Sequence, residues 1–172
     1  LRSVRDELEP TGVARTLTFA AHHFGRLTNR PDLRIALCAL NPHAGEGGAF
    51  GHEEALLEAA VTQAQAALAS TQHRCFGPFP ADTIFLRALR GEFDLVVALY
   101  HDQGLIPLKV LEPTTAVNLT LGLPFIRTSP DHGTAFDRAG HWTADAENTL
   151  HAARLALQLA ERRLLPHDRE FR

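Results

Sequence analysis

Short apolar runs alternate with helical patterns along this sequence, and this alternation constrains the fold more than any other feature. Leu33–Leu40 (LRIALCAL) and Asp94–Leu99 (DLVVAL) have the length and composition of strands that are buried on both faces. Between them, Glu53–Ser70 is rich in Ala, Leu, Glu and Gln, which favours a helix. The alternation predicts an α/β fold in which a mostly parallel sheet is flanked by helices on both faces.

The remaining segments extend the predicted pattern. Val13–Arg26 carries apolar residues at helical spacing and predicts a helix that ends before Pro31. Asp82 is expected to cap a short helix that runs to Ala88. The other expected elements are loops at Gly77–Ala81 and Tyr100–Gly104, extended segments at Ala116–Leu121 and Phe125–Thr128, a polar loop at Asp131–Gly140 and a final helix over Thr143–Leu165 with Thr143 as its cap.

Composition excludes several classes of protein. The chain has 172 residues, 45% of them hydrophobic, which fits one soluble globular domain over 1–172. A formal net charge of -3 argues against binding to nucleic acid or to an anionic membrane. No apolar run approaches the roughly 18 residues of a membrane span, and no signal peptide is evident. Cys38 and Cys75 form no metal or redox motif, so we expect reduced thiols and a cytoplasmic protein.

Three polar loops each follow a strand-like segment. They are Asn41–Gly48 (NPHAGEGG), Tyr100–Gly104 (YHDQG) and the loop with the sequence SPDHGTAFDRAG. Ligands of open parallel sheets bind beyond the carboxyl ends of the strands. We therefore expect these loops to gather at one edge of the sheet and to form the functional site.

Two of these loops carry histidines that can bind a metal ion. His43 and His101 follow different strands, so their imidazoles can converge on one cation. Asp102 can ligate the ion or orient an imidazole. Alternatively, both histidines form hydrogen bonds to loop backbone only. Seven other histidines lie on predicted helices or their ends and are expected to face solvent: His22, His23, His52, His73, His141, His151 and His167.

Polar residues in apolar surroundings suggest an anion site. Lys109, Asn118 and Arg127 provide an ammonium, an amide and a guanidinium, which together suit a phosphate or a carboxylate. Lys109 is also the one lysine of the chain. Alternatively, these side chains extend to solvent from a strand edge. Three residues of the next polar loop can bind a nucleotide or can cap turns: Asp131, His132 and Asp137.

Together, the segments LNPHAGEGGAFG, GPFPADT, YHDQGLIPLK and AVNLTLGLPFIRTSPDHGTAFDRAG closely resemble the 4-hydroxythreonine-4-phosphate dehydrogenase family of pyridoxal phosphate biosynthesis. The resemblance runs in order from about Leu1 to the final helix. It implies a fold like that of the isocitrate and isopropylmalate dehydrogenases, with two α/β domains around a cleft. It also implies a homodimer with the active site at the interface. The chain would be the carboxy-terminal portion of such a protein.

The resemblance also implies roles for individual residues. Family metal ligands match His43 and His101, and acidic residues near the metal match Asp82 and Asp102. The substrate-binding residues of the family match Lys109, Asn118 and Arg127. His132–Gly140 resembles the nucleotide-binding loop of the wider superfamily, which makes His132, Gly133, Thr134 and Asp137 candidate cofactor ligands. Asp102 and Lys109 are the candidate catalytic residues.

One family feature is absent from the sequence. The third metal-binding histidine of the family would lie just upstream of Leu1. His22 and His23 fall in a predicted helix and are not expected to replace it. Because the chain also contains no Met, we expect a piece of a longer protein that is inactive by itself.

The expected activity is a metal-dependent NAD or NADP oxidoreductase. It would oxidise and decarboxylate 4-phosphohydroxy-L-threonine to an aminoketone phosphate, with zinc as the first choice of metal and magnesium, cobalt or manganese as others. One alternative is a dehydrogenase of 4-phospho-threonate or 4-phospho-erythronate in sugar-acid catabolism. Another is a non-catalytic domain that binds a metal or a nucleotide. An acyltransferase related by fold only would leave the histidine loops without a role.

Overall fold

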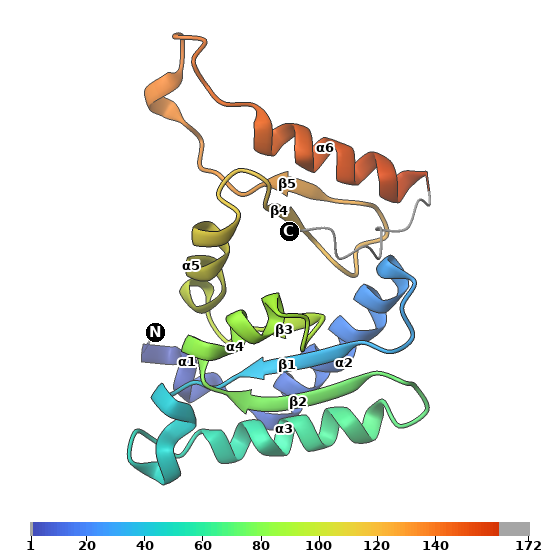
Figure 1. The fold of residues 1–172 in the computed structure, drawn as a ribbon, viewed down its shortest axis with the longest axis vertical. Helices are drawn as coiled ribbons and strands as arrows, with labels where there is room; N and C mark the ends of the chain where they lie inside the picture. The colour runs from blue at the N-terminus through green and yellow to red at the C-terminus, as the bar shows by residue number, and fades with distance from the viewer. Residues whose placement is uncertain (1, 162–172) are drawn as a thin grey trace. The chain divides into compact units, whose positions relative to one another are not determined.

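The computed structural model describes residues 2–161 and divides into two compact units (Figure 1). The first unit comprises the residues up to Arg26 together with Arg30–Pro107. The second comprises Leu27–Asn29 and the residues from Leu108 onward. The expectation of one domain over 1–172 stays a prediction.

A three-stranded parallel sheet forms the centre of the first unit. Its strands are β1 (Arg34–Cys38), β2 (Arg74–Phe79) and β3 (Leu95–Val97), in the order β2-β1-β3. Ile35 of β1 lies opposite Cys75 of β2 and Leu95 of β3. The predicted α/β class with a mostly parallel sheet is thereby confirmed.

Two helices cover one face of this sheet. They are α2 (Pro10–Thr28) and α3 (Glu54–Ala67), which confirm the predicted helices with small shifts of their ends. Their apolar stripes pack against alternate residues of β1 in one core, whose largest fully buried members are Leu17, Leu33, Ile35, Leu37, Leu57 and Leu68. Burial of each such side chain stabilises the folded state by about 1.5–3 kcal/mol, so this core is a main source of the stability of the unit.

The opposite face of the sheet packs against α4 (Ala81–Leu89). Ala36 and Cys38 of β1 contact Ile84 of the helix and Phe93 in a second core. Cys38 is free and fully buried, and burial raises the pKa of its thiol to about 12. The expected burial of this thiol is confirmed.

The segment around Gly77–Ala81 was expected to be a loop, and this prediction is wrong. Its first half belongs to β2, which pairs with β1 over most of its length. Gly77 and Pro78 disguise the strand, because both residues usually mark turns. Gly77 adopts φ +121, and a Cβ there would lie 2.6 Å from the Leu37 carbonyl oxygen, so only glycine fits against β1.

Two helix starts also differ from expectation. Asp82 lies inside the first turn of α4 and makes no capping hydrogen bond, because Pro80 occupies the N-cap position. Thr143 does not cap the last helix, α6 (Glu147–Ala160), where Asp145 Oδ1 instead accepts a hydrogen bond from the Glu147 N–H at 2.9 Å. The predicted end of that helix at Leu165 lies outside the described residues.

The expected loop at Tyr100–Gly104 is largely helical. α5 (His101–Leu111) begins directly after the short turn that follows β3. Gly104 and Pro107 lie inside this helix and hide it from sequence patterns, because both residues normally oppose helix formation. The short elements of the first unit are α1 (Arg2–Glu7) and the 3-10 segment η1 (Pro42–Gly48).

The second unit contains an antiparallel ribbon that packs against α6. Its strands are β4 (Val117–Leu119) and β5 (Thr128–Pro130). The expected strand at Ala116–Leu121 is confirmed, whereas the one at Phe125–Thr128 is displaced toward the carboxyl end. Thr128 Oγ1 donates a hydrogen bond to the Ala152 carbonyl of α6 at 2.9 Å.

In the part of the chain described here, residues 2–161, no helix combines the length and apolar character that crossing a membrane requires.

Asp94 anchors the starts of β1 and β3. Its carboxylate accepts hydrogen bonds from Arg30 Nη1 (2.5 Å), the Arg34 N–H (2.8 Å) and the Arg34 guanidinium (3.1 Å). Burial raises the pKa of this carboxyl, but the bonds from Arg34 and Arg30 outweigh burial and hold the pKa at about 2. Asp94 is therefore ionised throughout the ordinary pH range.

We expect Asp94→Asn to destabilise the protein by roughly 2 kcal/mol at neutral pH. The folded-state pKa is lowered, so the stabilisation is present above the ordinary pKa of 3.8 and is lost as the pH falls toward about 2. Urea unfolding at several pH values should show the difference between variant and wild type shrinking across that window. Asp32→Asn, at an exposed partner of Arg30, is the control and should change stability by less than about 1 kcal/mol.

Candidate functional site

The carboxyl ends of β1 and β3 lie side by side, because the two strands are parallel neighbours in register. The loop that begins at Asn41 and the helix that begins at His101 leave the sheet from these two ends. The expectation that these two polar segments share one edge is confirmed. The third polar loop follows β5, which belongs to a separate antiparallel sheet, so the expectation that it leaves the same sheet edge is wrong.

Gln103 ties the two strand ends together. Its side chain is buried, its Nε2 donates to the Ala39 carbonyl after β1, and its Oε1 accepts from the Leu99 N–H after β3, both at 2.8 Å. Sequence reasoning missed this residue. The sequence contained one signal for it: Gln103 lies two positions after the candidate ligand His101, and apolar segments flank this stretch.

His101 and Asp102 form the exposed start of α5. Asp102 Oδ1 lies 2.8 Å from His101 Nδ1, and both side chains are well exposed, at 77% and 70%. A carboxylate at Nδ1 orients an imidazole and leaves Nε2 available as a ligand atom. The arrangement fits the role predicted for Asp102 as an orienting group.

His43 lies in a left-handed turn. Six consecutive residues, from His43 to Gly48, have positive φ, and three of them (His43, Ala44 and Glu46) are not glycine. Such residues cost about 1–2 kcal/mol each in this conformation, so surrounding contacts must hold the turn. The His43 side chain is exposed, and its ring lies 6.0 Å from the Phe50 ring.

Two buried carboxylates hold the base of this turn. Asn41 Nδ2 donates to Glu53 Oε2 at 2.8 Å and to Glu54 Oε2 at 3.0 Å, while the Asn41 N–H donates to Glu54 Oε1 at 3.0 Å. The hydrogen bond from Asn41 lowers the pKa of Glu53, and Arg5 forms an ion pair with the same carboxylate. Neither glutamate was singled out from the sequence, because a Glu pair at a helix start usually faces solvent.

The described residues contain no complete set of ligands for a metal ion. Among residues 2–161, no three or more His, Cys, Asp or Glu side chains cluster closely enough to hold a metal ion. Catalytic metal sites keep an open position for water or substrate, and metal binding by His43 and His101 stays a prediction. Asp82, which the family resemblance places near the metal, is exposed in the first turn of α4.

The ribbon of the second unit presents a polar face. Asn118 pairs with Ser129, and the Thr120 N–H donates to the Arg127 carbonyl at 3.0 Å. Side chains alternate across a strand, so these four residues share the face opposite the one that contacts α6. Arg127 Nη1 also donates to Thr120 Oγ1 at 2.8 Å, which orients the guanidinium. Two of the three predicted anion-binding residues therefore share one surface.

Lys109 extends from α5 to the residue that follows this ribbon. Its Nζ donates to the Asp131 carbonyl at 2.8 Å and to Asp131 Oδ2 at 2.9 Å. An ammonium group carries three donors, and the side chain is 53% exposed, so one donor stays available for a ligand. Asp131 thus holds the lysine in place, and its expected role in nucleotide binding or turn capping stays a prediction.

The candidate nucleotide loop is exposed. His132 Nδ1 lies 2.8 Å from the Gly133 carbonyl, and Asp137 pairs with the neighbouring Arg138 in the short 3-10 segment η2 (Phe136–Arg138). Thr134 is also exposed. The role of these residues as cofactor ligands stays a prediction.

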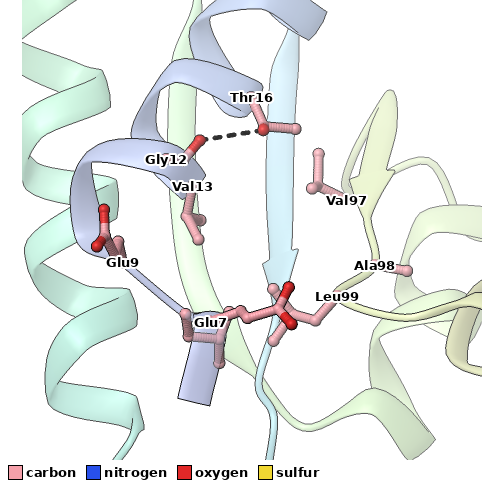
Figure 2. Close-up of a pocket in the computed structure, with 9 residues that line it drawn as sticks. Glu7, Glu9, Gly12, Val13, Thr16, Val97, Ala98 and Leu99 are labelled. Carbon is pink, nitrogen blue, oxygen red and sulfur yellow. Dashed lines mark hydrogen bonds between the residues drawn. The ribbon is translucent and has the colours of Figure 1, made fainter. Parts of the chain in front are cut away.

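A small hollow of about 200 Å³ lies elsewhere in the first unit, between the start of α2 and the end of β3 (Figure 2). Val13, Val97 and Leu99 give it an apolar lining, and Glu7 and Glu9 also line it. None of the predicted site residues lines it.

One histidine expected at the surface is buried. His73 precedes β2, is 6% exposed, and its Nδ1 accepts the Leu33 N–H at 3.2 Å. Burial lowers the pKa of His73, and the nearby His22 lowers it further. The expectation of solvent exposure holds for His22, His52 and His141, while His23 and His151 are half-buried. His167 lies outside the described residues.

Comparison with known proteins defines the family. The model of the pyridoxal phosphate biosynthetic protein PdxA family matches residues 1–156. The chain belongs to this family. It is 50% identical to a D-threonate 4-phosphate dehydrogenase from Cupriavidus necator over 157 residues, which are 91% of the chain and 46% of that protein. A 4-hydroxythreonine-4-phosphate dehydrogenase from a Ruegeria species is 46% identical over 164 residues, 95% of the chain and 49% of that protein.

A solved structure of the PdxA family has the same fold. The crystal structure of 4-hydroxythreonine-4-phosphate dehydrogenase from Klebsiella pneumoniae matches with a TM-score of 0.80 and 42% identity, over 93% of the chain and 48% of the solved protein. The chain spans about half the length of the curated relatives that it matches. The resemblance read from the sequence motifs is confirmed at the level of the family.

Asp131→Asn should free Lys109 in this PdxA-family chain. The variant keeps the carbonyl acceptor but loses the charged one, so we expect the lysine side chain to become more mobile while stability changes by less than about 1 kcal/mol. Because Lys109 is the one lysine, selective isotope labelling gives a single side-chain NMR signal whose relaxation reports its mobility. Asp137→Asn, at the exposed Arg138 pair, is the control. Unchanged lysine dynamics in Asp131→Asn would contradict the assigned contact.

Proposed function

We propose that the protein to which this chain belongs is a metal-dependent NAD or NADP dehydrogenase of a small phosphorylated hydroxy acid. The first candidate substrate is 4-phosphohydroxy-L-threonine, oxidised and decarboxylated to an aminoketone phosphate. The observation that carries the proposal is the pair of polar surfaces in a PdxA-family chain. One presents His43 and His101 at adjacent strand ends, and the other presents Arg127 and Asn118 on one ribbon face.

The second unit has the chemistry to bind an anionic substrate. Arg127 is held by Thr120 and can engage two oxygens of a phosphate or carboxylate at once. Lys109, held by Asp131, adds a point charge, and Asn118 adds an amide donor. Fixed positive charges that are oriented in advance stabilise an anion without reorganisation during the reaction.

The first unit has the chemistry to activate an alcohol. A divalent cation, zinc first among the candidates, would polarise the substrate hydroxyl as a Lewis acid, and the nicotinamide would accept the hydride from the same carbon. His43 and His101 are the proposed ligands. Asp102 orients the His101 ring through Nδ1 and is the candidate acceptor of the hydroxyl proton. The resulting β-keto acid loses carbon dioxide to give the aminoketone.

A second substrate is favoured by one specific observation. The Cupriavidus necator relative, at 50% identity, is named for D-threonate 4-phosphate. This compound shares the phosphate, the carboxylate and the secondary alcohol with the first candidate and differs in carrying a hydroxyl in place of the amine. The residues proposed here bind the shared groups, so they suit either compound.

We also propose that the protein acts as a homodimer, as the family resemblance implies. Two imidazoles without a third protein ligand in the described residues are consistent with a site that other protein groups complete.

The test uses the protein expressed from its complete gene, with zinc and either nicotinamide cofactor. We expect NADH or NADPH to form with 4-phosphohydroxy-L-threonine or with D-threonate 4-phosphate, and the ratio of the kcat/KM values identifies the preferred substrate. His101→Ala should abolish turnover and reduce the bound metal, because it removes one of two imidazoles.

His52→Ala is the matched control, because His52 is exposed and lies just after the turn that carries His43. It should retain activity and metal. If the wild type binds metal or nucleotide but oxidises neither compound, a non-catalytic binding domain replaces the proposal. Unchanged turnover and metal content in His101→Ala would remove the ligand assignment.

A further inference from the structure

The loop that carries His43 depends on contacts below it that the proposed chemistry does not use. Its left-handed turn contains His43, Ala44 and Glu46, residues that rarely adopt positive φ. Within the turn, the Phe50 N–H donates to the Gly45 carbonyl at 3.2 Å and the Ala49 N–H to the Glu46 carbonyl at 3.4 Å. These two bonds close the end of the turn, in addition to the hydrogen bonds within η1 itself, and the start of the turn has a further fixation.

Asn41 provides this fixation through both its backbone and its side chain. Its backbone N–H and its two amide hydrogens all end on carboxylate oxygens of Glu53 and Glu54. Glu53 Oε2 also accepts the His52 N–H at 3.0 Å, at the other end of the loop. The two glutamates, 7% and 8% exposed, therefore contact both ends of the segment that carries His43.

Two glycines make room for the carboxylates. A Cβ at Gly45 would lie 2.6 Å from Glu54 Oε2, and a Cβ at Gly51 would lie 2.4 Å from both Asn41 Nδ2 and Glu53 Oε2. The glycine-rich composition of the loop thus serves the close approach of two acids as well as the backbone conformation. The loop and the acids fit each other as one unit.

We propose that Glu53 and Glu54 are positioning residues, which act through Asn41 to hold His43 in the orientation needed for metal ligation. This role rests on the proposed function, because it assumes that His43 is a ligand. Both carboxylate oxygens of Glu54 accept hydrogen bonds from Asn41. A glutamine at this position would keep one acceptor oxygen, and its NH₂ group would face an N–H donor of Asn41, so one of the two bonds would be lost.

The test compares Glu54→Gln and Asn41→Ala with Glu58→Gln, an exposed glutamate one turn further along α3. In the protein expressed from its complete gene, Mn²⁺ affinity should fall about 10- to 100-fold in the first two variants and stay unchanged in the third. Excess Mn²⁺ should restore much of kcat, while KM for the phosphorylated substrate changes little. Hydrogen exchange of the amides from Ala44 to Gly48 should speed up, while exchange in β1 stays slow.

A purely structural role predicts a different result. If the first two variants have a lower melting temperature but the same Mn²⁺ affinity, the positioning role is overturned. Unchanged loop exchange in both variants would also overturn it. His43→Ala separates this proposal from the proposed function. Unchanged Mn²⁺ affinity in His43→Ala would remove the metal ligand of the proposed function, whereas the exchange data would still report whether the two acids hold the loop.

Discussion

The buried amide of Gln103 joins the ends of β1 and β3, from which the segments that carry His43 and His101 leave the sheet. Its Oε1 accepts a hydrogen bond from the Leu99 N–H, and its Nε2 donates one to the Ala39 carbonyl. One side chain therefore satisfies a backbone group just beyond the end of each strand. Because a buried polar group without a partner is costly, this contact holds the carboxyl ends of β1 and β3 in place relative to each other. His43 and His101 lie a few residues beyond these strand ends.

Part of this arrangement could be predicted from the sequence, because it follows from periodicity. The continuous apolar run at Leu33–Leu40 predicted a strand buried on both faces, and the two cores on either side of β1 explain why it is apolar throughout. The sharing of one edge by two polar segments followed from parallel pairing alone. Single-sequence patterns failed where a residue acts against its usual preference, as Gly77 does in β2 and Pro107 does in α5.

The candidate site residues divide in the same way. Residue type indicated Arg127 and Lys109 as anion-binding groups, because guanidinium and ammonium groups in apolar surroundings are unusual. Their partners Thr120 and Asp131 could not be predicted, since each contact depends on tertiary structure. A strained turn is equally invisible from sequence. Residue type does not indicate that His43, Ala44 and Glu46, which are not glycine, adopt positive φ in this turn.

The central claim is that His43 and His101 share one cation. NMR spectra of the protein with isotope-labelled histidine, recorded during a zinc titration, test it most directly. The account predicts that both imidazole signals change together and that the change is complete at one zinc per site, while the exposed His52 stays unaffected. Independent changes of His43 and His101 at different zinc concentrations, or a response from only one of them, would contradict the account.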